Sequence, residues 1–341
     1  MFKLPCISEG AIVEYCKTCN AKSLQAELRH IRDCDKHERV SRGHVSDLLM
    51  SCDRCPDYQP GPIDRFRFHL SADGIGDAII GLFAAAGLAD RFNLPVEFYT
   101  KHPGWFHGNV SHPGVTILPH TETEVDGNFN YDDQLATAAE KKCYSRGKWY
   151  CDSISRQYGL PPFDPVFPAV VNRPEPTPQL GSGGYVILSP FSAYSSREWP
   201  EYRWTELAHV LHSRRQRVIV IGSRDHENRL SRVFGSTYAS WWYGQPEQWV
   251  CSAIANADGV ICNDSGMAHV AGLYSVPCRT IMTHVPGNFV FGLYSTVKVI
   301  NANRDKWKCQ GCVWRSEYGF RPECNNGCPA LRDISAIEVL S

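Results

Sequence analysis

The spacing of apolar and polar residues predicts a strand, a helix and a second strand between residues 64 and 100. Residues 64–70 (DRFRFHL) alternate apolar and polar positions, as a half-buried strand does. Residues 71–92 hold a glycine turn followed by an apolar, alanine-rich helix, and residues 95–100 are typical of a strand. A strand, a tight glycine loop, a helix and another strand make a βαβ unit.

The pattern restarts more clearly after residue 184. The expected elements alternate between strands at 185–190, 217–223, 258–264 and 278–282 and helices at 201–214, 225–234 and 266–274. Alternation at this spacing favours a parallel sheet covered by helices on both faces. The sequence therefore predicts an α/β protein with two Rossmann-like domains, and ligands are expected in the cleft between the carboxyl ends of both sheets.

Breaker-rich segments suggest the domain boundaries. The run CPDYQPGPID at 55–64 closes a polar, cysteine-rich segment, and the proline-rich residues 172–184 are interpreted as an interdomain linker. Residues 100–180 are less regular. The predicted parts are a cysteine-rich module at 1–60, an N-terminal Rossmann-like acceptor domain at 61–178, a C-terminal Rossmann-like donor domain at 179–305, and a cysteine finger with a C-terminal helix at 306–341.

Composition narrows the class of protein. Hydrophobic residues make up 43% of the 341 residues and charged residues 21%, as in folded globular proteins. With 35 basic and 36 acidic residues, the chain has no electrostatic reason to take nucleic acid or an anionic membrane as its main partner. No stretch approaches the ~20 apolar residues that span a bilayer, and the N-terminus lacks the apolar core of a secretion signal. A cytoplasmic location is therefore expected.

Fifteen cysteines then raise the question of metal binding. In a reducing compartment, clustered cysteines are more often metal ligands than disulfides. Near the C-terminus, Cys309 and Cys312 form one close pair, and Cys324 and Cys328 form another. Two such pairs fit four thiolates around one tetrahedral metal, and this spacing suits zinc and iron equally.

A second metal site is predicted near the N-terminus. The favoured ligands are Cys16, Cys19, Cys52 and Cys55. Cys34 and His37 form a third pair that competes with them. Both predicted sites are structural, because four thiolates leave no open coordination position for catalysis.

The glycine loop at 74–76 places an acid at the start of a helix. It does not match a nicotinamide-binding fingerprint, because Ile79 stands where the third glycine is required. Gly74 and Gly76 still allow a sharp turn or a close ligand. Asp77 faces the expected cleft, where a carboxylate can accept a proton from an attacking hydroxyl. The alternative is a first-turn acid that stabilises the helix dipole, and Asp73 competes as the base.

A second candidate site is the turn CNDSGMAHVAG at 262–272. Free backbone N–H groups at a helix N-terminus bind phosphate, and Gly266 lets the phosphate come close. Ser265 could donate another hydrogen bond, and His269 lies one turn along. Asp264 would repel a phosphate, so it is expected to accept hydrogen bonds from sugar hydroxyls or loop backbone. The alternative is plain helix capping.

The loop at 189–200 opens at the same sheet edge. It offers several hydroxyls and one cation: Ser189, Ser192, Ser195, Ser196 and Arg197. Hydroxyls beside a guanidinium suit a diphosphate, which arginine can grip through two hydrogen bonds. The alternative is a solvated turn.

The motifs GDAI, SPFSAYSSREWPEYRWTELA, VIVIGSRDHE, ADGVICNDSGMAHVAGLYSVP and THVPGNFVFGLY resemble, in their order, the ADP-heptose-dependent heptosyltransferase family. The resemblance covers residues 64–300. It implies the GT-B arrangement of two Rossmann-like domains, with the acceptor held mainly by the first and a nucleotide-sugar donor by the second. It also implies inverting transfer to a glycan or protein hydroxyl without a catalytic metal.

The resemblance assigns roles to individual residues. Asp77 matches the acid that deprotonates the acceptor, and Arg197 stands where a lysine usually binds the donor phosphates. Glu227 falls near an acid that binds the ribose. The donor loop is matched by Asp264, Ser265, Gly266 and His269. The chain departs from the family pattern in having arginine at 197 and DSGMAH in place of DTGLSH. These departures leave the identity of the donor sugar undetermined.

The C-terminal finger is similar to that of bacterial autotransporter heptosyltransferases, where it holds iron. That similarity is compatible with a protein acceptor. A lipopolysaccharide-type acceptor would instead bring peripheral contact with a membrane. The competing hypotheses are a nucleotide-sugar 2-epimerase on the same fold and a non-enzymatic metal-finger protein that binds a partner.

Overall fold

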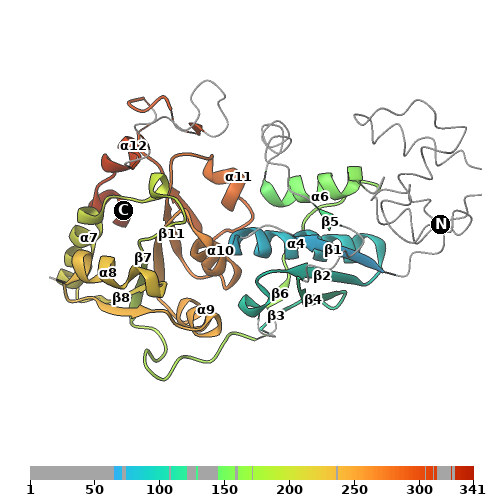
Figure 1. Ribbon diagram of the computed structural model, residues 1–341, viewed down its shortest axis with the longest axis horizontal. Helices are drawn as coiled ribbons and strands as arrows, with labels where there is room; N and C mark the ends of the chain where they lie inside the picture. The colour runs from blue at the N-terminus through green and yellow to red at the C-terminus, as the bar shows by residue number, and fades with distance from the viewer. Residues whose placement is uncertain are drawn as a thin grey trace, which may run out of the picture.

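The computed structural model is of an α/β protein with two parallel sheets (Figure 1). It describes residues 65–70, 74–106, 109–120, 128–129, 145–157, 160–170, 172–235, 237–303, 305–309, 311–312, 324 and 327–341. The predicted N-terminal module, with Cys16, Cys19, Cys52, Cys55, Cys34 and His37, lies outside the described residues, as does Asp73.

The first sheet has four parallel strands in the order β4-β2-β1-β5. They are β1 (Phe66–Leu70), β2 (Val96–Thr100), β4 (Val115–Pro119) and β5 (Asn128–Phe129). Helix α4 (Ile75–Phe92) covers one face, and α6 (Arg146–Gln157) packs on α4. Gly81 of α4 lies so close to the sheet that a Cβ there would meet Leu70 and Phe98 at 3.0 Å. A short antiparallel pair joins β3 (Val110–Ser111) to β6 (Ala169–Val170).

The second sheet has six parallel strands in the order β12-β11-β10-β7-β8-β9. They are β7 (Tyr185–Ser189), β8 (Arg217–Gly222), β9 (Ser240–Tyr243), β10 (Gly259–Asn263), β11 (Cys278–Ile281) and β12 (Val297–Ile300). The predicted parallel α/β fold is thus confirmed, and β9 and β12 extend the expected sheet at its two edges.

Helices cover both faces of this sheet. They are α7 (Glu201–Ser213), α8 (Glu227–Phe234), α9 (Glu247–Ala255), α10 (Gly266–Leu273), α11 (Gly287–Phe291), α12 (Pro329–Arg332) and α13 (Ala336–Leu340). Three 3₁₀ turns are η1 (Pro103–Trp105), η2 (Ser195–Arg197) and η3 (Arg224–His226). Alternate residues of β8 point to opposite faces: Ile219 joins the core under α9 and α10, and Val220 joins the core under α7 and α8.

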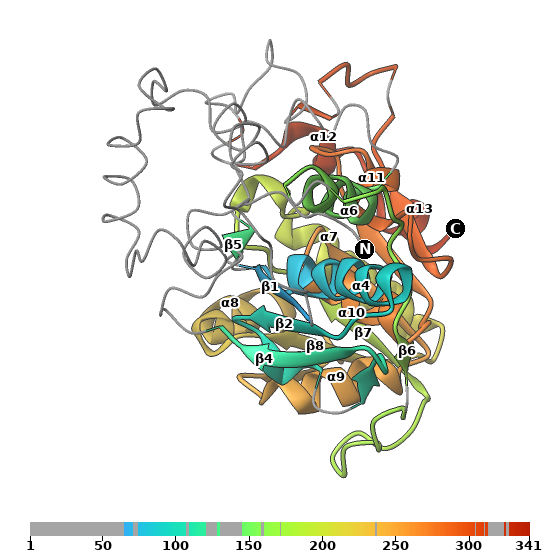
Figure 2. The same ribbon diagram turned by 90° about the vertical axis from the view of Figure 1, so that its right-hand side faces the viewer.

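The first turns of α4 and α10 meet between the two sheets (Figures 1 and 2). A Cβ on Gly266 would lie 2.8 Å from Cβ of Ile75, and a Cβ on Gly76 would lie 2.5 Å from Cδ2 of His269. Both glycines are therefore needed for the approach of one helix to the other. The carboxyl ends of β1 and β10, which precede these helices, are brought together by the same contact.

Among the described residues, no helix is both long and apolar enough to cross a membrane.

Candidate active site

Asp77 lies in the first turn of α4, with its side chain 25% exposed. Its Oδ1 accepts hydrogen bonds from Nη1 of Arg146 at 3.2 Å and from the hydroxyl of Tyr150 at 3.1 Å. Within the described residues, Oδ2 accepts none. The N-cap of α4 is Gly74, and no side chain caps this helix. The carboxylate is therefore anchored through one oxygen, and its other oxygen can take a proton.

The two anchoring residues were not anticipated from the sequence. Arg146 and Tyr150 stand four residues apart on α6, so they share a helix face. The guanidinium of Arg146 also lies 5.6 Å from the ring centre of Phe289 on α11, which lies between β11 and β12 of the second sheet. The spacing of Arg146 and Tyr150 would have placed both on one face of a helix. No helix was predicted there, because residues 100–180 lack a regular pattern.

The loops after β7 and β10 are tied together by Asn263. Its side-chain amide donates to the carbonyl of Pro190, and its Oδ1 accepts from the backbone N–H of Trp199 at 2.9 Å. The hydroxyl of Ser192 donates to the carbonyl of Asp264 at 3.1 Å. Ser192 therefore holds the loop in place here, and the buried Ser189 ends β7 beside it.

Asp264 is 9% exposed, and its Oδ2 faces the imidazole of His284 and the guanidinium of Arg197. Nε2 of His284 lies 2.9 Å away, and Nη1 of Arg197 lies 3.6 Å away. Burial alone would raise the pKa of Asp264, but the contact with His284, helped by the charges of Arg197 and Arg146, holds it well below its usual range. Asp264 is thus a buried carboxylate that stays ionised.

Among the described residues, Oγ of Ser265 and Nε of Arg197 find no hydrogen-bond partner although both atoms are buried. Ser265 is the N-cap of α10, and its side chain makes no capping bond. Buried donors are almost always satisfied in folded proteins. Together with the unpaired N–H groups expected at a helix N-terminus, they mark a place for an acceptor-rich ligand.

His269 is buried where α4 meets α10, and its contact with the ligand stays a prediction. It is 4% exposed, and its Nδ1 lies 3.0 Å from the hydroxyl of Tyr294. Burial, followed by the charge of Arg146, lowers the pKa of His269 to about 4. Because its ring fills the space that Gly76 leaves open, His269 forms part of the contact between α4 and α10.

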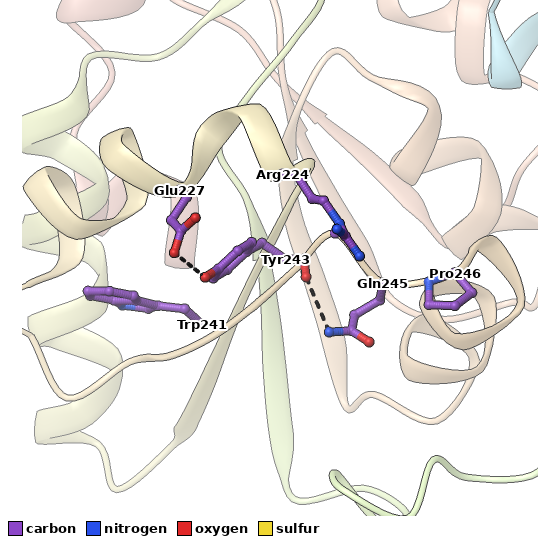
Figure 3. Close-up of a pocket in the computed structure, with 7 residues that line it drawn as sticks. Arg224, Glu227, Trp241, Tyr243, Gln245 and Pro246 are labelled. Atoms are coloured by element: carbon purple, nitrogen blue, oxygen red, sulfur yellow. Dashed lines mark hydrogen bonds between the residues drawn. The ribbon is translucent and has the colours of Figure 1, made fainter.

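A pocket of about 580 Å³ lies further along the same sheet edge, where β8 and β9 end (Figure 3). Its lining residues are Arg224, Glu227, Trp241, Tyr243, Gly244, Gln245 and Pro246. The carboxylate of Glu227 accepts a hydrogen bond from the hydroxyl of Tyr243, and the amide of Gln245 donates to the carbonyl of Tyr243 at 3.2 Å. Trp241 is 37% exposed, so the pocket combines a carboxylate with open aromatic surface.

The predicted C-terminal metal site is not confirmed. Cys309, Cys312, Cys324 and Cys328 are half-buried thiols, and in the part of the chain that the structure describes no three Cys, His, Asp or Glu side chains gather as metal ligands. The hydroxyl of Thr283 lies 3.4 Å from Sγ of Cys328. Most of the loop between the two pairs lies outside the described residues, so the metal site stays a prediction.

Comparison with known proteins gives one family and several similar structures. Residues 167–313 match the model of glycosyltransferase family 9 (heptosyltransferase). No curated protein matches the chain. The iron-containing dodecameric glycosyltransferase TibC of enterotoxigenic E. coli is similar at a TM-score of 0.58 and 15% identity, over 81% of this chain and 74% of that one.

Two further structures are similar over nearly their whole length. The E. coli ADP-heptose lipopolysaccharide heptosyltransferase II has a TM-score of 0.52 at 14% identity, with 81% of this chain and 96% of that one covered. The E. coli heptosyltransferase WaaC, solved with ADP-2-deoxy-2-fluoro heptose, has a TM-score of 0.51 at 14% identity, with 81% and 98% covered. These three likenesses concern the fold.

Proposed function

We propose that the chain, whose residues 167–313 match the model of glycosyltransferase family 9, is a glycosyltransferase that moves a heptose from a nucleoside-diphosphate donor to a hydroxyl of a glycan or protein, with inversion. The observation that carries the proposal is the contact between α4 and α10, which places Asp77 beside the turn at 264–269. One domain then supplies the acceptor side of the reaction, within 61–178, and the other the donor side, within 179–305.

Asp77 acts as the base in this proposal. Its Oδ1 is held by Arg146 and Tyr150, so Oδ2 is the oxygen that takes the proton of the acceptor hydroxyl. The new bond forms between the acceptor oxygen and the anomeric carbon, while the bond from that carbon to the diphosphate oxygen breaks. Attack on the face opposite the leaving group inverts the anomeric centre.

The donor diphosphate binds at the first turn of α10. The buried donors of Ser265 and Arg197 provide hydrogen bonds to phosphate oxygens, and the helix dipole favours the negative charge. These interactions strengthen as charge develops on the departing diphosphate, which lowers the barrier to transfer.

The nucleoside binds in the pocket at the ends of β8 and β9. Glu227 accepts hydrogen bonds from ribose hydroxyls, and Trp241 and Tyr243 offer apolar surface to the base. Neighbouring strands lie about 4.8 Å apart, so the three steps from β10 to β9 span roughly 14 Å. A nucleoside diphosphate can extend along this edge with its sugar end near Asp77.

The test is the Asp77→Asn substitution, which removes the proton acceptor at nearly constant shape. ADP-heptose is supplied with heptose-deficient lipopolysaccharide or with a serine- and threonine-rich peptide, and ADP release and the product are measured. Transfer should fall by about 10²–10⁴-fold, while the Kd of ADP, measured by calorimetry, stays within about twofold.

The matched control is Asp90→Asn, which changes an exposed carboxylate near the other end of α4. It should transfer at the wild-type rate. Full activity of the Asp77 variant would refute the assignment of the base. Isomerisation of the donor sugar without any acceptor would instead favour a 2-epimerase.

A further inference from the structure

His284 lies in the segment after β11 and has a buried side chain. Its Nε2 lies 2.9 Å from Oδ2 of Asp264, the same oxygen that Arg197 approaches at 3.6 Å. One carboxylate oxygen therefore faces an imidazole and a guanidinium from different strand ends, and the imidazole of His284 is the nearer of the two.

Two backbone hydrogen bonds hold the residues just before His284. The N–H of Met282 donates to the carbonyl of Ile300 at 3.1 Å, and the N–H of Gly311 donates to the carbonyl of Thr283 at 2.7 Å. Val285, the next residue, is buried in the core. The imidazole is thus presented to Asp264 by a held segment, and little reorganisation is needed for it to stay there.

A carboxylate at this position opposes diphosphate binding in two ways. It repels the phosphates, and it occupies the guanidinium of Arg197, which the phosphates need. When Arg197 turns toward a diphosphate, Asp264 loses a counter-charge while it remains buried, and a buried carboxylate without a partner is costly. His284 is already in place to provide that partner.

We propose that His284 is a positioning residue of the donor site, which holds the carboxylate of Asp264 so that Arg197 can bind the donor diphosphate. This inference rests on the proposed function. The pKa of Asp264 agrees with this role. Burial raises that pKa, and the contact with His284 is the largest of the contributions that lower it. His284 acts through Asp264 and touches no reacting atom.

The experiment compares two probes, ADP and adenosine, which differ only in the diphosphate. Calorimetry gives the Kd of each probe for four proteins. They are the wild type, the two single variants His284→Gln and Asp264→Asn, and the double variant that combines them. Glutamine keeps a hydrogen-bond donor but cannot carry charge. We expect His284→Gln to weaken ADP binding about tenfold or more and to change adenosine binding less than about twofold.

The double variant separates positioning from mere packing. If His284 serves to balance the charge of Asp264, its substitution should cost little ADP affinity once residue 264 is asparagine. If His284→Gln fails to fold, recovery of folding in the double variant supports the same conclusion, and failure of both variants to fold overturns it. Equal losses for ADP and adenosine, or the same loss of ADP affinity in both backgrounds, also overturn it.

Arg197→Ala distinguishes this inference from the proposed function. Unchanged ADP binding in that variant would remove the proposed diphosphate site itself. Weakened ADP binding in Arg197→Ala together with wild-type binding in His284→Gln would leave the donor site standing and reject only the role of His284.

Discussion

Two histidines buried in different domains keep their rings neutral. His269 packs between Gly76 and Tyr294, and His69 of β1 stacks on Tyr99 with ring centres 4.0 Å apart. Nε2 of His69 is buried and has no hydrogen-bond partner in the part of the chain that the structure describes. Burial, with the nearby charges of His120 and Arg67, lowers the pKa of His69 to about 4 against a contribution from Glu97. Both rings resist protonation in the folded protein.

This resistance predicts a loss of stability in mild acid. Above pH 6.5 both histidines are neutral in the folded and unfolded chain, so they add no pH dependence. Between pH 6.5 and about 4 the two histidines bind protons in the unfolded chain but not in the folded protein. The free energy of unfolding therefore falls as the pH falls. Asp264 does not oppose this trend, because a carboxylate with a lowered pKa loses its contribution only below its unfolded pKa near 3.8.

Urea unfolding at pH 7 and pH 5 measures the effect. His69→Phe keeps the stack on Tyr99 and should reduce the loss between the two pH values by about 1–2 kcal/mol. The exposed His209→Phe should leave the loss as it is in the wild type. An unchanged loss in the His69 variant would mean that this ring is protonated in the folded protein.

Single residues also show how far a sequence can lead to a site. Asp77 and the turn at 264–266 could be anticipated, because each lies at the start of a helix that comes after a strand with a recognisable apolar run. Arg146 and His284 could not, since their contacts with Asp77 and Asp264 join residues 69 and 20 positions apart. The sequence places His269 in the turn at 262–272. Its burial could not be predicted, because it depends on α4, which lies almost 200 residues earlier in the chain.

At the scale of elements, strands in the middle of the sheets could be predicted and strands at the edges could not. The central β7, β8 and β10 are continuous apolar runs, because both of their faces are covered. The edge strand β9 has the half-exposed sequence SWWY, which carries no such signal. Helix α6 was missed because it follows an irregular stretch and covers only one side of α4.

The C-terminal helices α12 and α13 belong to the core of the second sheet. Leu331 of α12 is buried against α7 and its neighbours, and the indole N–H of Trp199 donates to the carbonyl of Ile334 at 3.0 Å. Ser335 and Glu338 form a capping box at the start of α13. These contacts make residues 329–341 a structural part of the region built on the second sheet.

A pair of leucine and isoleucine substitutions tests this placement. Leu331→Ala removes buried methyl groups and should lower the free energy of unfolding by about 2–4 kcal/mol. Ile337→Ala, at a position on α13 that is 68% exposed, should change it by less than about 0.5 kcal/mol. Denaturant unfolding followed by tryptophan fluorescence measures both. Equal effects of the two variants would show that α12 does not rest on the core.

At the scale of the whole molecule, one apolar core runs through both sheets. It joins residues under the first sheet, such as Leu70 and Phe83, to residues under the second, such as Ile187 and Val270. A second connection lies at η1, where the thiol of Cys251 contacts the carbonyl of Trp105 at 3.4 Å. The resemblance to the heptosyltransferase family is confirmed by the family model, but a continuous core between the domains could not be inferred from a linker at 172–184.

A continuous core predicts that the two sheets unfold together. Hydrogen exchange followed by mass spectrometry should give peptides from β1 and α4 the same free energy of opening as peptides from β7 and β10.

Gly76→Ala should separate these values, because its Cβ would lie 2.5 Å from Cδ2 of His269 and force the first turns of α4 and α10 apart. Gly259→Ala is the control, since its Cβ would meet nothing closer than 3.5 Å. If the β1 and α4 peptides open at least about 2 kcal/mol more easily than the others in the wild type, the core is divided. The contact between α4 and α10 would then not hold the two sheets together.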